Sequence, residues 1–553
     1  MRKSTIKQEW AEADVLCVGG GIAGLMAAIR ASELGAKVIV AEKGNSLRSG
    51  NAATGIDHIR CYIPEIHGHD VEAMTRVLQR SQHGGEGFRQ KNFMRTWMEK
   101  SFDIVKLWER WGIPMKYKGN YDFQGHTLSG QLNMALHFSG QDLKKTLTRE
   151  ATKSGAEILN RIMAFEVLGD DSVIGALGIS TREDKIIQFK AKSVILGTGP
   201  CTRLYSGPTP GWMCNQRMSP SCTGDGRAMA YRVGAELVNV ELPVLRCGPK
   251  YFARAGKGTW AGVVRDPHGT PIGPFVTKPD AKEGDAVVDY YQGVFRDYAM
   301  KGNGPLYMDC RGISEEDLDY MMYFLKNEGN SGLVSYLKAE GIDIRKNPVE
   351  FMTYNDFYLR GGISFNERGE TSIKGLYAAG DEFGGGGSAA AVFGWIAGEH
   401  AARYAHTASP PDIDKARTTI EEKSTLLNEL RGRHTGAHWK EANLALQQIM
   451  GDHAGFVRSE TLLTAGLGYL RRLKEKAHST LAAHNPHELM RCLEVLNLLD
   501  VGELVFIAAN ERKETRGQHV RTDYPLTNPL MQQLLIIKKR GEEPVTEWRA
   551  VQS

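Results

Sequence analysis

The segment from residue 15 to residue 42 constrains the fold of this chain most, because two short apolar runs flank a glycine-rich turn. Gly19, Gly21 and Gly24 form the pattern G-x-G-x-x-G directly after the first run. Glycines at this spacing allow a tight turn, the close approach of backbone to a diphosphate, and the close packing of a helix on a strand. The segment therefore predicts a buried parallel strand, a helix that ends before the C-cap Gly35, and a second strand.

The same segment predicts a dinucleotide-binding site. The N-terminus of the helix offers free N–H groups and a partial positive charge to phosphates. Glu42 lies 18 residues after Gly24, at the end of the second strand, where a carboxylate would accept hydrogen bonds from ribose hydroxyls. The residues of this segment expected to bind the dinucleotide are Gly19, Gly21, Ile22, Ala23, Gly24, Glu42 and Lys43.

Two further segments favour FAD over NAD. Residues 373–381 read as a strand that ends at Gly380 and Asp381, and a helix of small residues follows from about Ser388. This arrangement resembles two-dinucleotide-binding-domain flavoproteins, in which such an Asp holds the ribityl chain and the helix directs its N-terminus at the pyrimidine edge of the flavin. Residues 191–199 read as a buried strand whose terminal turn could pass close to the cofactor, and an NAD-only dehydrogenase would need neither segment. The cofactor-binding residues expected here are Thr198, Gly199, Gly380, Asp381, Ser388 and Ala389.

The composition of the chain argues against several classes of protein. The 553 residues suffice for two or three domains with sizeable cores. The formal net charge of +4, from 69 basic and 65 acidic side chains, is too balanced to indicate a nucleic acid or a membrane surface as partner. The sequence has neither a long uninterrupted apolar run nor a secretory signal, and its eight cysteines include no C-x-x-C pair. We therefore expect a protein that is cytoplasmic or peripheral to a membrane complex, with free thiols and with no membrane span, bound metal or iron–sulfur cluster of its own.

The chain divides into three expected parts. A discontinuous FAD domain covers residues 1–240 and 352–408. Residues 241–351 are rich in Gly, Pro and aromatic residues, carry no dinucleotide signature, and are expected to form an inserted capping domain. After a boundary at Ser409-Pro410-Pro411, residues 409–553 are expected to form a C-terminal helical domain, because apolar residues recur there at three- and four-residue spacing. The clearest helical patterns cover residues 420–430, 459–478 and 487–511.

Taken together, the motifs resemble those of the flavoprotein subunits of succinate dehydrogenase, fumarate reductase and adenylylsulfate reductase, over nearly the whole chain. The motifs are the first glycine pattern, Arg48-Ser49-Gly50, Ala52-Ala53-Thr54-Gly55, Thr223-Gly224-Asp225-Gly226, Gly361-Gly362-Ile363, Gly380-Asp381 and the string from Arg512 to Pro525. The resemblance implies an α/β fold (α+β overall), with a glutathione-reductase-like Rossmann FAD domain, an inserted capping domain and a C-terminal helical domain. It also implies cofactor contacts from Arg48, Ser49, Gly50, Ala53, Thr54, Gly55 and Asp225.

The string Arg48-Ser49-Gly50 resembles the adenylylsulfate reductase branch most. Succinate dehydrogenases and membrane fumarate reductases place a His close to this Ser and bond it covalently to the flavin. No His occurs between Glu42 and Asp57 of this chain, so the resemblance implies noncovalent FAD. Proteins of this family usually pass electrons to an iron–sulfur subunit, which implies a ferredoxin-like partner and a hetero-oligomer.

Several substrate-binding positions depart from the family pattern. Where the family has a His shortly before Gly-Gly-Ile, this chain has Phe357, and residues 383–392 contain no counterpart of the family's substrate-binding Arg. These losses argue against fumarate and succinate, because an unpaired desolvated carboxylate is costly. Arg60 stands where the adenylylsulfate reductase pattern has an Asn, which argues against adenylylsulfate. The proton-shuttle Arg of the capping domain has Arg254 or Lys257 as its nearest counterpart.

A polar group remains on the segment expected to run beneath the isoalloxazine ring, at Asp57, His58 and Arg60. Arg60 would orient an anionic group and His58 would act as general acid or base, although Asp57 and Arg60 could instead pair structurally. The expected catalytic residues are His58, Arg60, Arg254, Lys257 and Arg360, and Arg246, Lys250 and Arg265 are further cationic candidates. The leading hypothesis is an FAD-dependent oxidoreductase that exchanges a hydride, or forms an adduct, at flavin N5 with a small anionic substrate.

Two other functions remain open from the residues. An electron-relay flavoprotein subunit of a larger redox complex, without a substrate of its own, fits the missing ligands and the glycine run at residues 384–387. An oxidase that passes electrons to oxygen, as aspartate oxidases of this family do, is the third possibility.

Overall fold

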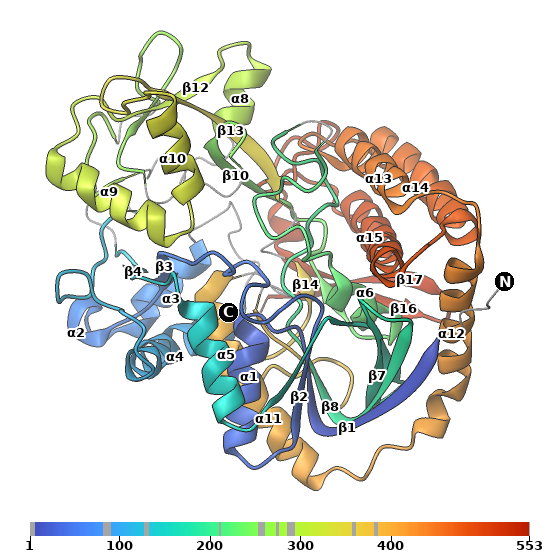
Figure 1. Ribbon diagram of the computed structural model, residues 1–553. Helices are drawn as coiled ribbons and strands as arrows, with labels where there is room; N and C mark the ends of the chain where they lie inside the picture. Colours follow the sequence, from blue (N-terminus) through green and yellow to red (C-terminus); the bar gives the residue numbers. More distant parts are fainter. Residues whose placement is uncertain are drawn as a thin grey trace.

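The computed structural model describes residues 6–80, 90–125, 132–209, 212–252, 260–272, 276–284, 294–356, 361–380 and 385–551. These residues form a central sheet with helices on both faces, a smaller lobe built on a second sheet, and a group of long helices from the C-terminal part of the chain (Figure 1). The predicted mixture of a parallel Rossmann-type sheet and separate helices is confirmed.

The central sheet has the strand order β5-β2-β1-β8-β7-β6, and β15 also pairs with β8. Its strands are β1 (Lys7–Val18), β2 (Val38–Glu42), β5 (Glu157–Asn160), β6 (Ile162–Gly169), β7 (Val173–Ser180), β8 (Lys185–Leu196) and β15 (Leu376–Ala378). β1 is parallel to β2 and β8, whereas β7 is antiparallel to both of its neighbours. The predicted strand–helix–strand unit is present, with α1 (Ile22–Glu33) between β1 and β2.

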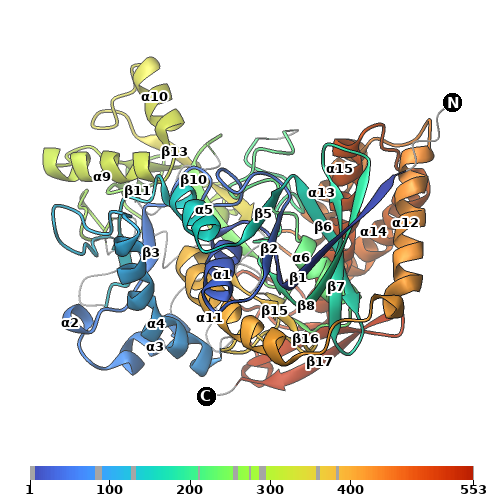
Figure 2. The same ribbon diagram turned by 60° about the horizontal axis from the view of Figure 1, so that its bottom comes forward.

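Alternate residues of β1 enter two different hydrophobic cores, as expected for a strand buried on both faces. Val15 and Cys17 belong to the core formed with α1, α4 (Lys91–Arg110), α5 (Leu143–Lys153) and α11 (Gly386–Thr407). Leu16 and Val18 belong to the opposite core, which includes α6 (Asp225–Arg232) and part of α15 (Pro486–Glu511). Figure 2 shows α1, α5 and α11 together on one side of the sheet.

The connection between β2 and α5 carries a short two-stranded sheet and small helices. Its elements are β3 (His58–Arg60), α2 (Pro64–His67), α3 (Val71–Arg80), α4 and β4 (Ala135–His137). β3 and β4 pair antiparallel, with His58 opposite His137.

The expected capping segment forms a lobe with its own hydrophobic core (Figure 1). Its sheet has the order β10-β13-β12-β11. The elements of the lobe are β10 (Val244–Pro249), β11 (Val263–Arg265), α8 (Val294–Met300), β12 (Leu306–Asp309), α9 (Glu315–Asn327), α10 (Ser331–Ala339) and β13 (Val349–Asp356). β13 runs past residue 351, the expected end of the segment, because it stays paired with β10 as the two strands lead back to the central sheet.

The predicted helices of the C-terminal part are confirmed as α12 (Arg417–Gly432), α14 (Glu460–Thr480) and α15, and α13 (Trp439–Ala454) and the short η2 (Ile413–Ala416) accompany them. The last residues are not helical. After η3 (Pro529–Met531), β16 (Gln533–Arg540) and β17 (Glu543–Ala550) join β9 (Leu237–Val238) and β14 (Gly362–Ile363) in a four-stranded sheet. The run Leu534–Ile537 is buried there, so burial of four successive apolar residues selects a strand over a surface helix.

None of the helices in the described ranges combines the length and the apolar character that crossing a membrane requires.

The packing of α11 on α1 depends on glycines, which gives a stability prediction. A Cβ at Gly398 would lie 2.3 Å from the carbonyl oxygen of Ala27. We expect Gly398→Ala to destabilise the protein by about 1–3 kcal/mol, as overpacked sites do, and to lower the midpoint of thermal unfolding. Gly468→Ala in α14 is the matched control, because its Cβ would approach only the Arg472 side chain, at 3.8 Å, and it should raise the midpoint slightly. An unchanged midpoint for Gly398→Ala would show that the two helices separate easily.

Candidate functional site

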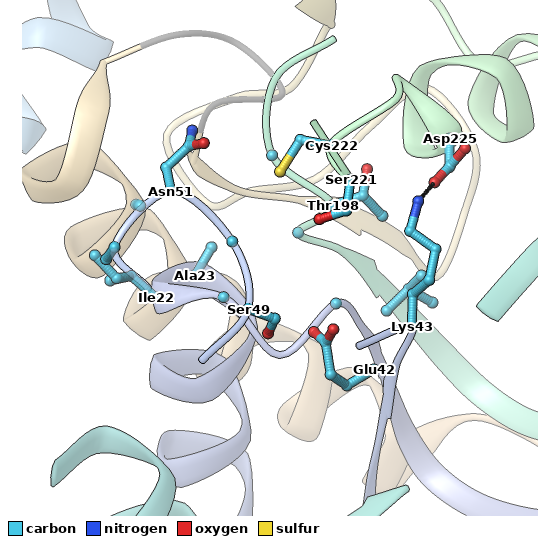
Figure 3. Close-up of a pocket in the computed structure, with 18 of the residues that line it drawn as sticks. Ile22, Ala23, Glu42, Lys43, Ser49, Asn51, Thr198, Ser221, Cys222 and Asp225 are labelled. Carbon is cyan, nitrogen blue, oxygen red and sulfur yellow. Dashed lines mark hydrogen bonds and ion pairs between the residues drawn. The ribbon is translucent and has the colours of Figure 1, made fainter. Parts of the chain in front are cut away.

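A cavity that opens to solvent lies along the carboxyl ends of β1, β2 and β8, and the empty space in and around it, part of the open solvent included, is about 950 Å³ (Figure 3). Its walls come from the turn before α1, the end of β2, the loop after it, the start of α5, β6, the turn after β8, the start of α6 and the start of α11. The lining residues are Val18, Gly19, Gly21, Ile22, Ala23, Ala41, Glu42, Lys43, Ser49–Ala52, Ile56, Lys144, Ile162–Ala164, Gly197–Gly199, Ser221, Cys222, Asp225, Ala379, Gly386, Gly387 and Ala390. Parallel α/β sheets bind their ligands at this edge.

The turn at the head of the cavity leaves the N-terminus of α1 open to a ligand. Gly19 has φ +98°, and a Cβ at Gly24 would lie 1.8 Å from the carbonyl oxygen of Gly19, so neither position accepts a side chain. The N-cap residue is Gly21, which has no side chain to accept a hydrogen bond from the first backbone N–H groups of α1. The first N–H groups of α1 and their partial positive charge therefore face the cavity, as an anionic group requires.

Glu42 occupies the position that the sequence predicts, at the end of β2. Its carboxylate is buried and accepts hydrogen bonds from the backbone N–H of Gly20 at 2.7 Å and of Gly44 at 2.5 Å. Figure 3 shows the side chain beside the turn, below Lys43. The backbone thus holds Glu42 in place in the wall of the cavity, where its carboxylate oxygens can also accept hydrogen bonds from a ribose.

Ser49 shows that the cavity suits a polar ligand. Its hydroxyl oxygen is buried and, within the described part of the chain, has no hydrogen-bond partner. A buried hydroxyl without a partner is unfavourable, and Ser49 lines the cavity beside Gly50 (Figure 3). A bound diphosphate or ribose would satisfy this oxygen.

Lys43 and Asp225 line the cavity but also pair with each other. The Lys43 ammonium lies 2.7 Å from the Asp225 carboxylate and 2.8 Å from that of Glu494 on α15. Burial works against the charge of Lys43, but Asp225 and Glu494 outweigh it and raise its pKa. Both residues are therefore ion-pair partners that join the cavity wall to α15, in addition to lining the cavity.

Lys144, on α5, is a cavity residue that sequence reasoning missed. It is 2% exposed and donates a hydrogen bond to the backbone carbonyl of Gly20. Burial lowers the pKa of this lysine to about 8, although Glu42 and Cys222 act in the opposite direction. Its position near the start of a helix, 120 residues after Gly24, carries no local signal, and only its burial among apolar neighbours distinguishes it.

The predicted cofactor residues divide into those that line the cavity and those that do not. Those that line the cavity are Gly19, Gly21, Ile22, Ala23, Glu42, Lys43, Ser49, Gly50, Thr198, Gly199 and Asp225. Those that lie outside the lining are Gly24, Arg48, Ala53, Thr54, Gly55, Gly380, Ser388 and Ala389. Arg48 and Thr54 are exposed. Ser388 accepts a hydrogen bond from the indole of Trp97 at 2.9 Å, and the neighbouring residues Gly387 and Ala390 face the cavity in its place.

Four predicted residues, Asp381, Arg254, Lys257 and Arg360, lie outside the described residues, as does Phe357. Of the further cationic candidates, Lys250 pairs with Glu350 at 2.8 Å and Arg265 pairs with Asp309 at 2.9 Å, both within the lobe built on β10, β11, β12 and β13.

His58 and Arg60 lie on β3 and are not among the residues that line the cavity. The His58 ring nitrogen Nδ1 is 2.7 Å from the carboxylate of Asp57, which is 1% exposed. The Arg60 guanidinium lies over the Trp97 ring, 5.7 Å from its centroid. Asp57 therefore pairs with His58, and the alternative from the sequence, an Asp57–Arg60 ion pair, stays a prediction.

The C-terminal string recognised in the sequence forms a buried ionic network away from the cavity. Arg512 contacts Glu241 at 2.6 Å and Glu514 at 3.1 Å, and Arg516 contacts Glu514 at 2.7 Å. None of these residues lines the cavity, so the described geometry gives the string a structural role.

Comparison with known protein families agrees with a dinucleotide-binding role for this cavity. The family described as FAD binding domain matches residues 14–392, and the family described as fumarate reductase flavoprotein C-term matches residues 443–553. The chain belongs to the FAD-binding fumarate reductase flavoprotein family. It is an FAD-dependent oxidoreductase, and FAD is its cofactor.

Individual relatives are similar over almost their whole length. One subunit of the CoM/CoB fumarate reductase of Methanothermobacter marburgensis is 26% identical, with 97% of this chain and 99% of the relative covered. An L-aspartate oxidase of Vibrio cholerae is 25% identical, with 93% and 96% covered. The solved adenylylsulfate reductase of Archaeoglobus fulgidus superposes with a TM-score of 0.87 at 22% identity, with 100% and 98% covered, which confirms the fold that the resemblance implies.

The cavity fits FAD on the grounds already given: an open helix N-terminus, a buried carboxylate at the end of β2, and the unsatisfied hydroxyl of Ser49. Ser49 provides a test of this fit. We expect Ser49→Ala to weaken FAD binding about fivefold, the effect of one hydrogen bond, without destabilising the FAD-free protein. The affinity is measured by titrating the FAD-free protein with FAD and monitoring the quenching of flavin fluorescence.

Ser46→Ala is the matched control for Ser49→Ala. The Ser46 hydroxyl is also buried without a partner in the described part of the chain, but Ser46 does not line the cavity. Equal effects of the two substitutions on FAD affinity would remove Ser49 from the cofactor site.

The absence of His between residues 42 and 57 predicts that FAD is held without a covalent bond. Acid precipitation of the purified protein should leave the yellow flavin in the supernatant and a colourless pellet. Flavin that stays with the polypeptide on a denaturing gel would contradict this prediction.

Proposed function

We propose that this chain is the flavoprotein subunit of an enzyme that oxidises or reduces a small anionic substrate and exchanges electrons with an iron–sulfur protein. The observation that carries the proposal is the Asp57–His58 pair at the start of β3. β3 contributes Ile59 beside the cavity residue Gly387, and His137, opposite His58 on β4, contacts Phe324 of α9. In this proposal residues 1–240 and 352–408 bind FAD, residues 241–351 cap the substrate, and residues 409–553 form the third domain.

The flavin end of the cavity is assigned to the side where α11 begins. Gly386 and Gly387 line the cavity there together with Ile56. A Cβ at Gly387 would lie 3.1 Å from the Ile56 side chain and 3.6 Å from that of Ile59, so β3 borders this end. The N-terminus of α11 places a partial positive charge at the same end, which favours the reduced, negatively charged state of a flavin. Bound FAD supplies a two-electron donor or acceptor there.

His58 is the proposed general acid or base. Its Nδ1 is held by the buried Asp57 carboxylate, and its side chain is 33% exposed. An imidazole that is oriented by a carboxylate through one nitrogen can exchange a proton with a substrate through the other. Arg60, two residues further along β3, is the proposed partner of the substrate's negative charge, with its guanidinium positioned over Trp97.

The capping lobe covers this region through the end of α9. The hydroxyl of Ser139 donates a hydrogen bond to the Asn327 side chain at 2.7 Å. A Cβ at Gly55 would lie 2.2 Å from the Asn327 carbonyl oxygen, and one at Gly329 would lie 2.4 Å from the Thr54 hydroxyl. The end of α9 therefore rests directly on the loop that precedes β3. Such a cover would exclude water from the substrate and strengthen its interaction with fixed charges.

The relatives support a complex with other proteins. The Methanothermobacter relative is by name one subunit of its enzyme. The sequence carries no C-x-x-C pair that could hold an iron–sulfur cluster, so electrons would pass to or from a separate protein. The L-aspartate oxidase relative keeps oxygen as an alternative acceptor, and hydrogen peroxide release during turnover distinguishes that route.

The test is flavin reduction in stopped flow with small mono- and dicarboxylates and sulfur oxyanions as candidate substrates. With the anion that bleaches the wild-type flavin, we expect His58→Ala and Arg60→Ala each to slow bleaching by about a hundredfold or more, the usual contribution of a positioned acid–base or charged group. Reduction by dithionite should be unchanged in both variants, because it bypasses the substrate site.

Arg76→Ala is the matched control, because Arg76 is an exposed arginine on α3 whose partner is Asp70. Undiminished bleaching in both the His58 and Arg60 variants would refute the site assignment. Flavin that is reduced only through a copurifying redox protein, and by none of the anions, would favour the electron-relay function instead.

A further inference from the structure

Lys144 is a buried lysine whose side chain reaches the glycine-rich turn from outside the βαβ unit. It is the second residue of α5, and α5 packs against α1 in the same hydrophobic core. Its ammonium donates to the carbonyl of Gly20, the residue between the two glycines that line the head of the cavity. The charge therefore sits beside the turn where a dinucleotide places its diphosphate.

The charges around the cavity single out Lys144. The charged residues in the described lining are Glu42, Lys43, Lys144 and Asp225. Lys43 has two carboxylate partners within 2.8 Å, and the Glu42 carboxylate accepts two backbone N–H groups. Lys144 has a neutral carbonyl as its hydrogen-bond partner in the described residues, and the titratable groups that act on its charge from further away are Glu42 and Cys222.

A buried ammonium with three N–H groups and a single neutral acceptor is a costly arrangement in a cofactor-free protein. The diphosphate of FAD brings two negative charges to the same turn, and the open N-terminus of α1 supplies only a partial positive charge. A full charge at low dielectric attracts such a dianion strongly even when a water or a peptide group separates the two.

We propose that Lys144 is the cation that holds the FAD diphosphate, acting from α5 behind the glycine-rich turn. The turn then contributes backbone N–H groups from α1, and α5 contributes the full charge that this turn lacks. Lys144 is a cofactor-binding residue in this assignment and takes no part in the transfer of electrons or protons.

The proposal gives a pH dependence with a definite sign. Burial lowers the pKa of Lys144 to about 8 in the cofactor-free protein, and a neighbouring dianion would raise that pKa in the complex. Diphosphate binding is therefore fully favoured below about pH 8 and weakens as the pH rises from there toward the higher pKa of the complex.

The experiment uses FAD-free full-length protein and isothermal titration with FAD, ADP-ribose and adenosine. ADP-ribose carries the same diphosphate diester without a flavin, and adenosine lacks the diphosphate. We expect Lys144→Met to weaken the binding of FAD and of ADP-ribose by about tenfold or more, as the loss of a charge-assisted contact does, and to leave adenosine binding unchanged. Lys145→Met is the matched control, because Lys145 is exposed and pairs with Asp142 at 2.6 Å, and it should leave the affinity for all three ligands unchanged.

Equal losses for ADP-ribose and adenosine in Lys144→Met would overturn the proposal, since they would mean that Lys144 only supports the shape of the turn. Unchanged affinities for all three ligands would overturn it as well. If the variant does not fold, the wild-type protein decides: the ratio of ADP-ribose to adenosine affinity should fall between about pH 7.5 and pH 9.5, and a constant ratio would contradict the assignment. These readouts do not involve turnover, so they are independent of the proposed substrate reaction.

Discussion

The contact between the Gly19 carbonyl and Gly24, too close for any Cβ, is the constraint on which the rest of this structure depends. It brings the first turn of α1 against the end of β1 and leaves the N–H groups of that turn open. The same requirement continues along α1, where Gly394 and Gly398 of α11 lie against the backbone of Ala23 and Ala27. Two helices from opposite ends of the FAD-binding region thus meet without intervening side chains, and this meeting brings the start of α11 to the cofactor cavity.

Buried ion pairs connect this region to the C-terminal helices. Glu494 on α15 binds Lys43 from the end of β2 at 2.8 Å and Arg203 at 2.7 Å, and these side chains are largely or fully buried. Burial of Glu494 disfavours its charge, but Arg203 and Lys43 hold its pKa well below the usual range. Removing one partner would leave an uncompensated charge, which costs far more than an exposed pair does. The wall of the cofactor cavity is therefore supported by a helix more than 250 residues away in sequence.

A second set of polar contacts forms where the lobe built on β10, β11, β12 and β13 meets β3 and β4. The Tyr320 hydroxyl on α9 donates to the Asp122 carboxylate, and burial together with this carboxylate raises the pKa of Tyr320 well above its usual range. The buried ring of His137 lies between His58 and Phe324, at centroid distances of 5.6 Å and 4.8 Å. The proposed acid–base residue is thus packed within a polar and aromatic layer shared with the lobe, so a movement of α9 would alter the surroundings of His58.

The sequence by itself determined the βαβ unit, the cofactor, the long C-terminal helices and the position of Glu42, because glycine spacing, apolar periodicity and strand ends are local signals. Only the tertiary structure decided which nearby residues face the cavity. Gly387 and Ala390 line it although Ser388 and Ala389 were expected, since the rotation of α11 is fixed by its glycines against α1. Likewise, Lys144 reaches the turn because α5 packs on α1, and β16 is a strand because it pairs with β9. Contacts between distant segments produce these features, and no local pattern encodes such contacts.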